Sequence, residues 1–287
     1  MRRAVEATVK FRTALLLAAA LMALTTGADA LSFKATFGSI KLNARPGDVV
    51  SSKFSLTLDA SEPRTRFHAL VEDWWPSEDG KQSFYAMSGT LEHSCGPWVV
   101  LNPVDADING GDTLTVRLTI HVSPQARPGG YWCALTLNEV PTPGARVAES
   151  GVKLKASVST GVFIFIAPVE RQVSILGIAH DENGALVQVQ NTGNAPITVR
   201  GQVEYRRSGA DTPVLSVPIS SGALLTERTV TGTYRAALPP NASLAPGTYN
   251  VRAVLDIGAD AFVAAETELA VSAPARAQER RSRVVPR

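Results

Sequence analysis

The residues of this sequence best suited to chemistry are its two cysteines, Cys95 and Cys133. A pair of thiols can form a disulfide, bind a metal or supply a nucleophile, depending on the compartment and on nearby groups. His93 stands two positions before Cys95, but a lone His-x-Cys lacks the further ligands of a zinc site. The histidines are scattered along the chain, as His68, His93, His121 and His180. No Gly-x-Ser-x-Gly elbow or phosphate-binding glycine loop occurs, so we expect a protein without metal, cofactor or enzymatic activity.

Residues 1–30 have the organisation of a secretory signal peptide. Arginine and lysine residues precede the apolar stretch 14–24, and the small residues Ala28 and Ala30 predict cleavage after Ala30. The apolar stretch is too short to cross about 30 Å of hydrocarbon, and no later stretch of about 20 apolar residues follows. We therefore expect a periplasmic or secreted protein with no membrane span in the mature chain.

An oxidising compartment favours a disulfide between Cys95 and Cys133, with two separate buried thiols as the alternative. On the chain-entropy estimate the bridge would stabilise the fold by roughly 4 kcal/mol. It would tie the strand that Cys95 enters to the sixth strand, across a β-sandwich. Tyr131 lies two residues before Cys133, the spacing at which immunoglobulin-like sandwiches turn a tyrosine hydroxyl onto the preceding corner. Tyr249 follows a similar Pro-Gly turn, so we expect both tyrosines to be architectural.

The charges are unevenly distributed along the chain. The whole sequence has a formal net charge of +2, but residues 31–287 carry 24 basic and 24 acidic side chains. The segment 273–287 holds five arginines and one glutamate, and its low apolar content predicts a disordered basic tail. Residues 31–272 are mildly acidic, with 19 basic and 23 acidic residues. Nucleic acid is therefore not an expected partner.

Alternation of apolar and polar residues dominates the sequence after the signal peptide. In TLTVRLTIHV, every second residue is apolar, which predicts a strand with one face in a core and the other in water. Gly-, Pro- and Asp-rich turns separate similar strands, and no segment shows a sustained apolar period of 3.6 residues. A second set of seven strand-like segments begins after Pro168. We predict an all-β protein of two consecutive immunoglobulin-like sandwiches, over residues 31–168 and 169–272.

The first of these domains resembles the amino-terminal domain of the periplasmic pilus chaperones, the PapD-like superfamily, over residues 33–168. The segments that carry the resemblance are FSLTLDAS, INGGDTLTVRLTI, YWCALTLNEVPTPG and LKASVSTGVFIFIAP. The resemblance implies binding of another extracytoplasmic polypeptide, pilin-like or an envelope protein, to which the seventh strand lends alternating apolar side chains. The residues with the required spacing are Val152, Leu154, Ala156 and Val158. The same alternation is also what any sandwich core needs.

The resemblance further implies basic residues in the cleft between the domains that hold the partner's terminal carboxylate. Counted back from Pro168, the family's anchoring lysine falls on Phe163, which cannot bind a carboxylate. Lys41 or Arg45 could stand for the family's basic residue on the first strand. This departure leaves room for a relative adapted to another partner.

Adjacent tryptophans, Trp74 and Trp75, support a second hypothesis. Neighbouring residues on a strand point to opposite faces, so one of the two could be exposed and bind a sugar or a protein. The chain would then be a structural or adhesive cell-envelope module that recognises glycan or matrix. A chaperone should instead offer a long open strand edge at 152–166 and a basic cleft near Pro168.

Overall fold

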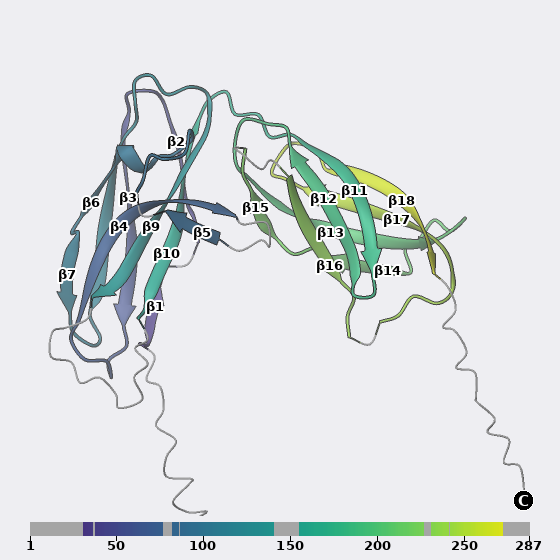
Figure 1. The fold of residues 1–287 in the computed structure, drawn as a ribbon, viewed down its shortest axis with the longest axis horizontal. Coiled ribbons are helices and arrows are strands. Elements are labelled where there is room, and N and C mark those ends of the chain that lie inside the picture. Colours follow the sequence, from purple (N-terminus) through teal and green to yellow (C-terminus); the bar gives the residue numbers. More distant parts are fainter. Residues whose placement is uncertain are drawn as a thin grey trace, which may run out of the picture.

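A computed structural model of the chain describes residues 31–36, 38–76, 82–85, 87–140, 155–226, 231–240 and 242–271. Within them the regular structure is β-strand with one short 3-10 helix, so the all-β prediction is confirmed. Figure 1 shows two lobes, one with β1 to β10 and the other with β11 to β18. No helix in the described part of the chain is long and apolar enough to cross a membrane. The predicted signal peptide and basic tail lie outside the described residues.

The first lobe is a sandwich of two sheets. One has the order β1 (Phe33–Ala35), β3 (Val49–Leu58), β8 (Thr113–His121) and β6 (Val99–Asn102). The other has the order β2 (Ile40–Ala44), β10 (Ser157–Ile166), β9 (Gly129–Val140), β4 (Thr65–Pro76) and β5 (Gln82–Tyr85), and β7 (Asp105–Ile108) also pairs with β4. The 3-10 helix η1 (Gly96–Trp98) leads into β6.

Strand β8 shows why this sequence forms a sandwich. Leu114, Val116, Leu118 and Ile120 are buried, and the residues between them face outward or are half-buried. They pack in one core with apolar residues of β3, β9 and β10. Each fully buried aliphatic side chain contributes roughly 1.5–3 kcal/mol, so these facing rows hold the two sheets together.

The second lobe repeats the arrangement with fewer strands. One sheet has the order β11 (Val173–Asp181), β12 (Gly184–Asn191) and β16 (Thr231–Ala237). The other has the order β14 (Leu215–Pro218), β13 (Ile197–Arg207), β17 (Gly247–Asp256) and β18 (Val263–Val271), and β15 (Gly222–Leu224) also pairs with β13. A separate apolar core lies between these sheets. The predicted pair of consecutive sandwiches is thus present.

Both tyrosines turn back onto the preceding corner, as predicted. The Tyr131 hydroxyl accepts a hydrogen bond of 3.0 Å from the Arg127 amide and lies 3.3 Å from the carbonyl of the same residue. The Tyr249 hydroxyl donates to the Ala245 carbonyl at 2.7 Å. Each bond fixes the loop before a central strand, β9 in the first lobe and β17 in the second.

The predicted disulfide between Cys95 and Cys133 is confirmed. Cys95 lies just before η1, and its amide donates to the Trp132 carbonyl at 3.1 Å. The segment before Cys95 therefore runs beside β9 before it crosses to β6 in the opposite sheet. The bridge ties β9 to this crossing segment, so it lies at the entry to the strand that the sequence indicated.

A buried carboxylate holds the segment that carries Cys95. Asp73 is fully buried on β4 and accepts hydrogen bonds from the Thr90 and Leu91 amides at 2.7 and 3.1 Å. The hydroxyls of Thr90 and Ser94 donate to the same carboxylate. Because a buried charge is tolerated only when donors surround it, Asp73 fixes the path of residues 90–94.

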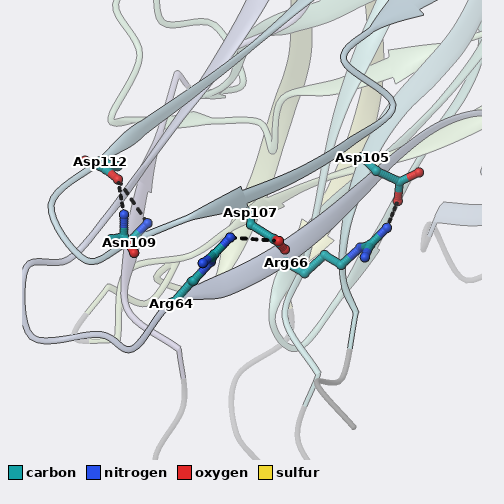
Figure 2. A network of polar contacts seen from close by, with 6 residues as sticks. All are labelled: Arg64, Arg66, Asp105, Asp107, Asn109 and Asp112. Atoms are coloured by element: carbon teal, nitrogen blue, oxygen red, sulfur yellow. Dashed lines mark hydrogen bonds and ion pairs between the residues drawn. The ribbon is translucent and has the colours of Figure 1, made fainter.

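An exposed polar network lines the outer edge of β4, where β7 pairs with it (Figure 2). Arg64 forms an ion pair with Asp107 at 3.1 Å, and Arg66 forms one with Asp105 at 3.6 Å. The His68 ring lies 3.1 Å from Asp105, and this hydrogen bond lowers the pKa of the carboxyl group. Exposed ion pairs are worth roughly 0–1 kcal/mol each, so the network covers this edge of β4 more than it stabilises the fold.

Candidate partner-binding edge and interdomain cleft

The edge of β10 is open along half its length because the first part of the chain changes sheets. β1 pairs with β3, whereas β2 runs parallel to residues 162–166 of β10 in the other sheet. Among the described residues, the first half of β10, residues 157–161, pairs on one side only, with β9. Thr160 donates a hydrogen bond to the Gly38 carbonyl, where the chain crosses between the sheets.

Backbone groups of Ser157 and Ser159 point toward this open side. The Glu139 amide donates to the Ala156 carbonyl at 2.9 Å, which makes residues 139 and 156 a directly bonded pair. In an antiparallel ladder such pairs alternate with residues whose N–H and C=O face the opposite edge. The even-numbered residues of β10 therefore bond to β9, and Ser157 and Ser159 present their backbone groups to the open side. Unpaired groups of this kind are a template for another strand.

The residues predicted to contact a partner lie partly on this edge. Ala156 and Val158 are half-buried, and Val158 packs against the core of the first lobe. Val152 and Leu154 lie outside the described residues. A long open edge was expected at 152–166, but β2 covers residues 162–166, so in the described residues the open edge is shorter than predicted.

Both adjacent tryptophans are buried, so the prediction of an exposed one is wrong. Trp74 and Trp75 are 4% and 7% exposed. They belong to a second apolar cluster of buried residues: Trp74, Trp75, Leu91, Trp132, Ala134, Phe163, Phe165, Ala195 and Leu225. The last two members come from the second lobe, which covers the outer face of β9 and β10. The adhesive alternative depended on an exposed indole, and neither residue provides one.

The strict alternation assumed for these tryptophans fails because β4 leaves β9. The pairing of β4 with β9 ends at Glu72, and residues 73–76 pair with β5 instead. The Trp132 ring nitrogen donates to the Trp74 carbonyl at 3.3 Å. Both indoles are therefore brought to the outer cluster, where Trp75 and Trp132 lie with ring centroids 6.1 Å apart.

Asn194 joins the two lobes. Its carbonyl accepts a hydrogen bond of 2.9 Å from the Gly130 amide at the start of β9. Its side chain accepts from the Glu170 amide at 2.8 Å and donates to the Pro168 carbonyl at 3.1 Å. The segment between β10 and β11 and the turn between β12 and β13 are thus held against the base of β9.

A cleft of about 330 Å³ lies between the lobes, at the inner end of β10. Phe163 and Lys41 face each other in the parallel pairing of β10 with β2, and both line it. Arg171 and Arg200 line it from the second domain, together with the carboxylate of Asp256. The guanidinium carbon of Arg171 lies 5.3 Å from the centroid of the Phe165 ring.

The cleft contains Lys41, one of the two predicted basic residues. It also contains two basic residues, Arg171 and Arg200, that the sequence did not indicate. Lys41 lies there as expected, whereas Arg45 lies in the turn after β2, where its amide bonds to Asp48. Phe163 is 8% exposed and packs edge to face on Trp74, so it offers no charge. Arg171 and Arg200 supply the other positive charges of the lining. In the described ranges, no cluster of three or more His, Cys, Asp or Glu residues is placed to hold a metal.

Comparison with known proteins yields similarity in structure but not in sequence. No protein-family model and no curated protein matches the chain. A chaperone of class 5 fimbriae, CfaA, matches with 10% identity and a TM-score of 0.47, over 85% of this chain and 100% of that one. A chain of the CsuC–CsuE chaperone–tip subunit complex of Acinetobacter baumannii archaic Csu pili matches with 14% identity and a TM-score of 0.44, over 82% and 97%. A chain of the Salmonella enterica complex of the SafA pilin with the SafB chaperone matches with 11% identity and a TM-score of 0.44. The match covers 85% of this chain and 99% of that one. The chain is thus similar, at low identity, to pilus chaperones.

Proposed function

We propose that this protein binds another polypeptide by accepting one of its strands along the open half of β10, in the manner of a pilus-type chaperone. The observation that carries the proposal is the pairing of residues 157–161 with β9 alone, while the rest of β10 is covered by β2. Strand addition of this kind uses main-chain hydrogen bonds for affinity and alternating side chains for specificity.

We propose that the added strand runs parallel to β10, as β2 does. A strand parallel to β10 on this edge would run in line with β2 and end near Gly161, just before the point where Ile40 pairs with Val162. The chain end would then approach the cleft that contains Lys41, Arg171 and Arg200. Three cations against the single carboxylate of Asp256 favour an anion, and a terminal carboxylate is the anion that a polypeptide end supplies.

Other cations can take the role of the lysine that the pilus chaperone pattern places at the position of Phe163. Phe163 occupies the expected position and is committed to the interdomain aromatic cluster. Lys41 faces Phe163 across the β10–β2 pair, and the second domain contributes Arg171 and Arg200. We therefore assign the carboxylate to cations from both domains, so that the site requires the interdomain geometry.

The test is a comparison of what co-purifies with the exported protein and with two single variants. Val158→Asp places a charge on the open half of β10, and Val100→Asp places one on the exposed face of β6, where Val100 is 56% exposed. We expect the first variant to lose the bound polypeptide and the second to retain it, with both variants folded by circular dichroism. Equal retention by both variants would exclude strand addition at this edge.

A further inference from the structure

A cavity of about 300 Å³ opens beside the free half of β10. Its lining includes residues 158–161, so any strand that pairs with this edge lies at its mouth. Trp74, Phe84 and Phe163 provide aromatic walls, and Thr198 and Ala223 close it from the second domain. The cavity adjoins the cleft that contains Lys41, because Phe163, Thr198 and Ala223 line both.

Small residues create this space. Ala134 and Gly161 face each other in the register of β9 and β10, and both line the cavity. A methyl group on Gly161 would lie 2.8 Å from a ring carbon of Phe163, so a larger residue at this position would displace the aromatic wall. Trp74 and Phe163 contact edge to face with ring centroids 6.1 Å apart, while Phe84 is 41% exposed at the rim.

The aromatic side of the cavity suits an apolar occupant, while the hydroxyls of Thr36, Ser39, Ser159, Thr160 and Thr198 line the rest of it. None of the described residues that line this cavity carries a charge, in contrast to the cleft with its three cations. A carboxylate or ammonium group here would lose hydration without gaining a partner of opposite charge, which is unfavourable. Aromatic walls instead favour a large apolar side chain, which buries about 150–250 Å² when it is aromatic.

We infer that the cavity receives one large apolar side chain, aromatic or long aliphatic, from the strand that adds to β10, and so determines which polypeptides bind. The inference rests on the proposed function, because strand addition brings the side chain to the mouth of the cavity. Side chains of an added strand alternate between two faces, and those on the face of Gly161 point toward the three aromatic rings. The expected ligand is therefore a segment with one obligatory bulky residue close to its carboxyl end.

The test is a selection from a library of 12-residue peptides with free carboxyl ends. The unaltered protein should enrich peptides that share Phe, Trp, Leu or Met at one fixed position. Replacing that residue with Ala in a selected peptide should weaken binding at least 10-fold. The protein variant Ala134→Leu fills the cavity. In this variant, replacing the bulky peptide residue with Ala should weaken binding less than 2-fold. Ala264→Leu, on an exposed position of β18, is the matched control and should keep the full 10-fold difference.

A second variant keeps the inference testable if Ala134→Leu does not fold. Phe84→Ala removes a half-exposed wall and should weaken the bulky peptide while leaving its Ala counterpart unchanged. If peptides bind the β10 edge without preference at any position, the cavity does not select the ligand, and the proposal of strand addition is unaffected. Failure of every peptide to compete with a polypeptide that co-purifies would count against both. A preference that persists unchanged in both variants would place the selecting pocket elsewhere.

Discussion

The amide of Gly130 donates a hydrogen bond of 2.9 Å to the carbonyl of Asn194, and this contact joins the two sandwiches at the base of β9. Gly130 approaches the second lobe so closely that a side chain would not fit. A β-carbon there would lie 2.3 Å from Cδ of Pro196 and 3.0 Å from Cα of Ala195. The cleft and the cavity both need this approach, because each takes residues from the two lobes.

We predict that Gly130→Ala lowers the free energy of unfolding by about 1–3 kcal/mol, because the methyl group forces the lobes apart. Small-angle scattering should show a larger maximum dimension in the variant. Gly177→Ala is the matched control, since a β-carbon at Gly177 would meet nothing within 4 Å. Equal unfolding midpoints in urea for the two variants would contradict a stabilising contact between the lobes at Gly130.

We predict that the double variant Cys95→Ala/Cys133→Ala is less stable by roughly 4 kcal/mol, since the bridge closes a loop of about 40 residues. Both cysteines are fully buried, so the lost sulfur packing adds to the effect. Urea unfolding of the oxidised protein, the reduced protein and the variant measures it. Reduced protein and variant should unfold at similar urea concentrations, and a loss under about 1 kcal/mol would show that the bridge is dispensable.

Asp181 gives the second lobe a predicted acid sensitivity. Arg235 donates two hydrogen bonds of 2.9 Å to its carboxylate, and these with the Asn183 amide lower the pKa of Asp181 from 3.8 to about 2. A carboxyl whose pKa is depressed by folding stabilises the fold above its unfolded pKa, and this contribution is lost as pH falls through the folded pKa.

The thermal midpoint of the unaltered protein should therefore fall as the pH decreases from about 4 to about 2. Asp181→Asn should be less stable at neutral pH and should lose less on acidification. Asp260→Asn, at an exposed position, is the control that should follow the unaltered protein. Parallel pH profiles for the unaltered protein and Asp181→Asn would contradict the role of the ion pair.

The cleft predicts that a partner's terminal carboxylate contributes to binding. Amidation of a bound peptide's carboxyl end should weaken its binding about 10-fold, the value of one charge-assisted hydrogen bond of about 1.5 kcal/mol. In Lys41→Gln/Arg200→Gln this difference should shrink to less than 3-fold, whereas Arg45→Gln should preserve it. Isothermal titration with the free and the amidated peptide measures the ratio, and an unchanged ratio in the double variant would exclude these two side chains.

Much of the first lobe could be predicted from local patterns. The alternation in β8, the corner at Tyr131 and the Cys95–Cys133 bridge each depend on residues that lie close together on one sandwich, and each is present. The pattern also predicted Lys41 in the cleft, through the resemblance to the pilus chaperones.

The site between the lobes could not be predicted in the same way, because local periodicity does not show which face another domain covers. Trp74 and Trp75 were expected on opposite faces, but the second lobe buries both. Arg171 and Arg200 reach the cleft only through the docking at Gly130 and Asn194. One signal was available in the sequence: the segment from Gly129 to Leu137 has almost no polar side chains, which is typical of a strand covered on both faces. In the structure every residue of this part of β9 is buried.

Hydrogen exchange at single amides of β10 tests the central claim most directly. In the free protein the amides of Val158 and Thr160 should exchange slowly, because they bond to β9, and those of Ser157 and Ser159 should exchange fast. Binding of a selected peptide should slow exchange at Ser157 and Ser159 at least 10-fold and leave Val158 and Thr160 slow. Fast exchange at Ser157 and Ser159 in the saturated complex would contradict strand addition along β10.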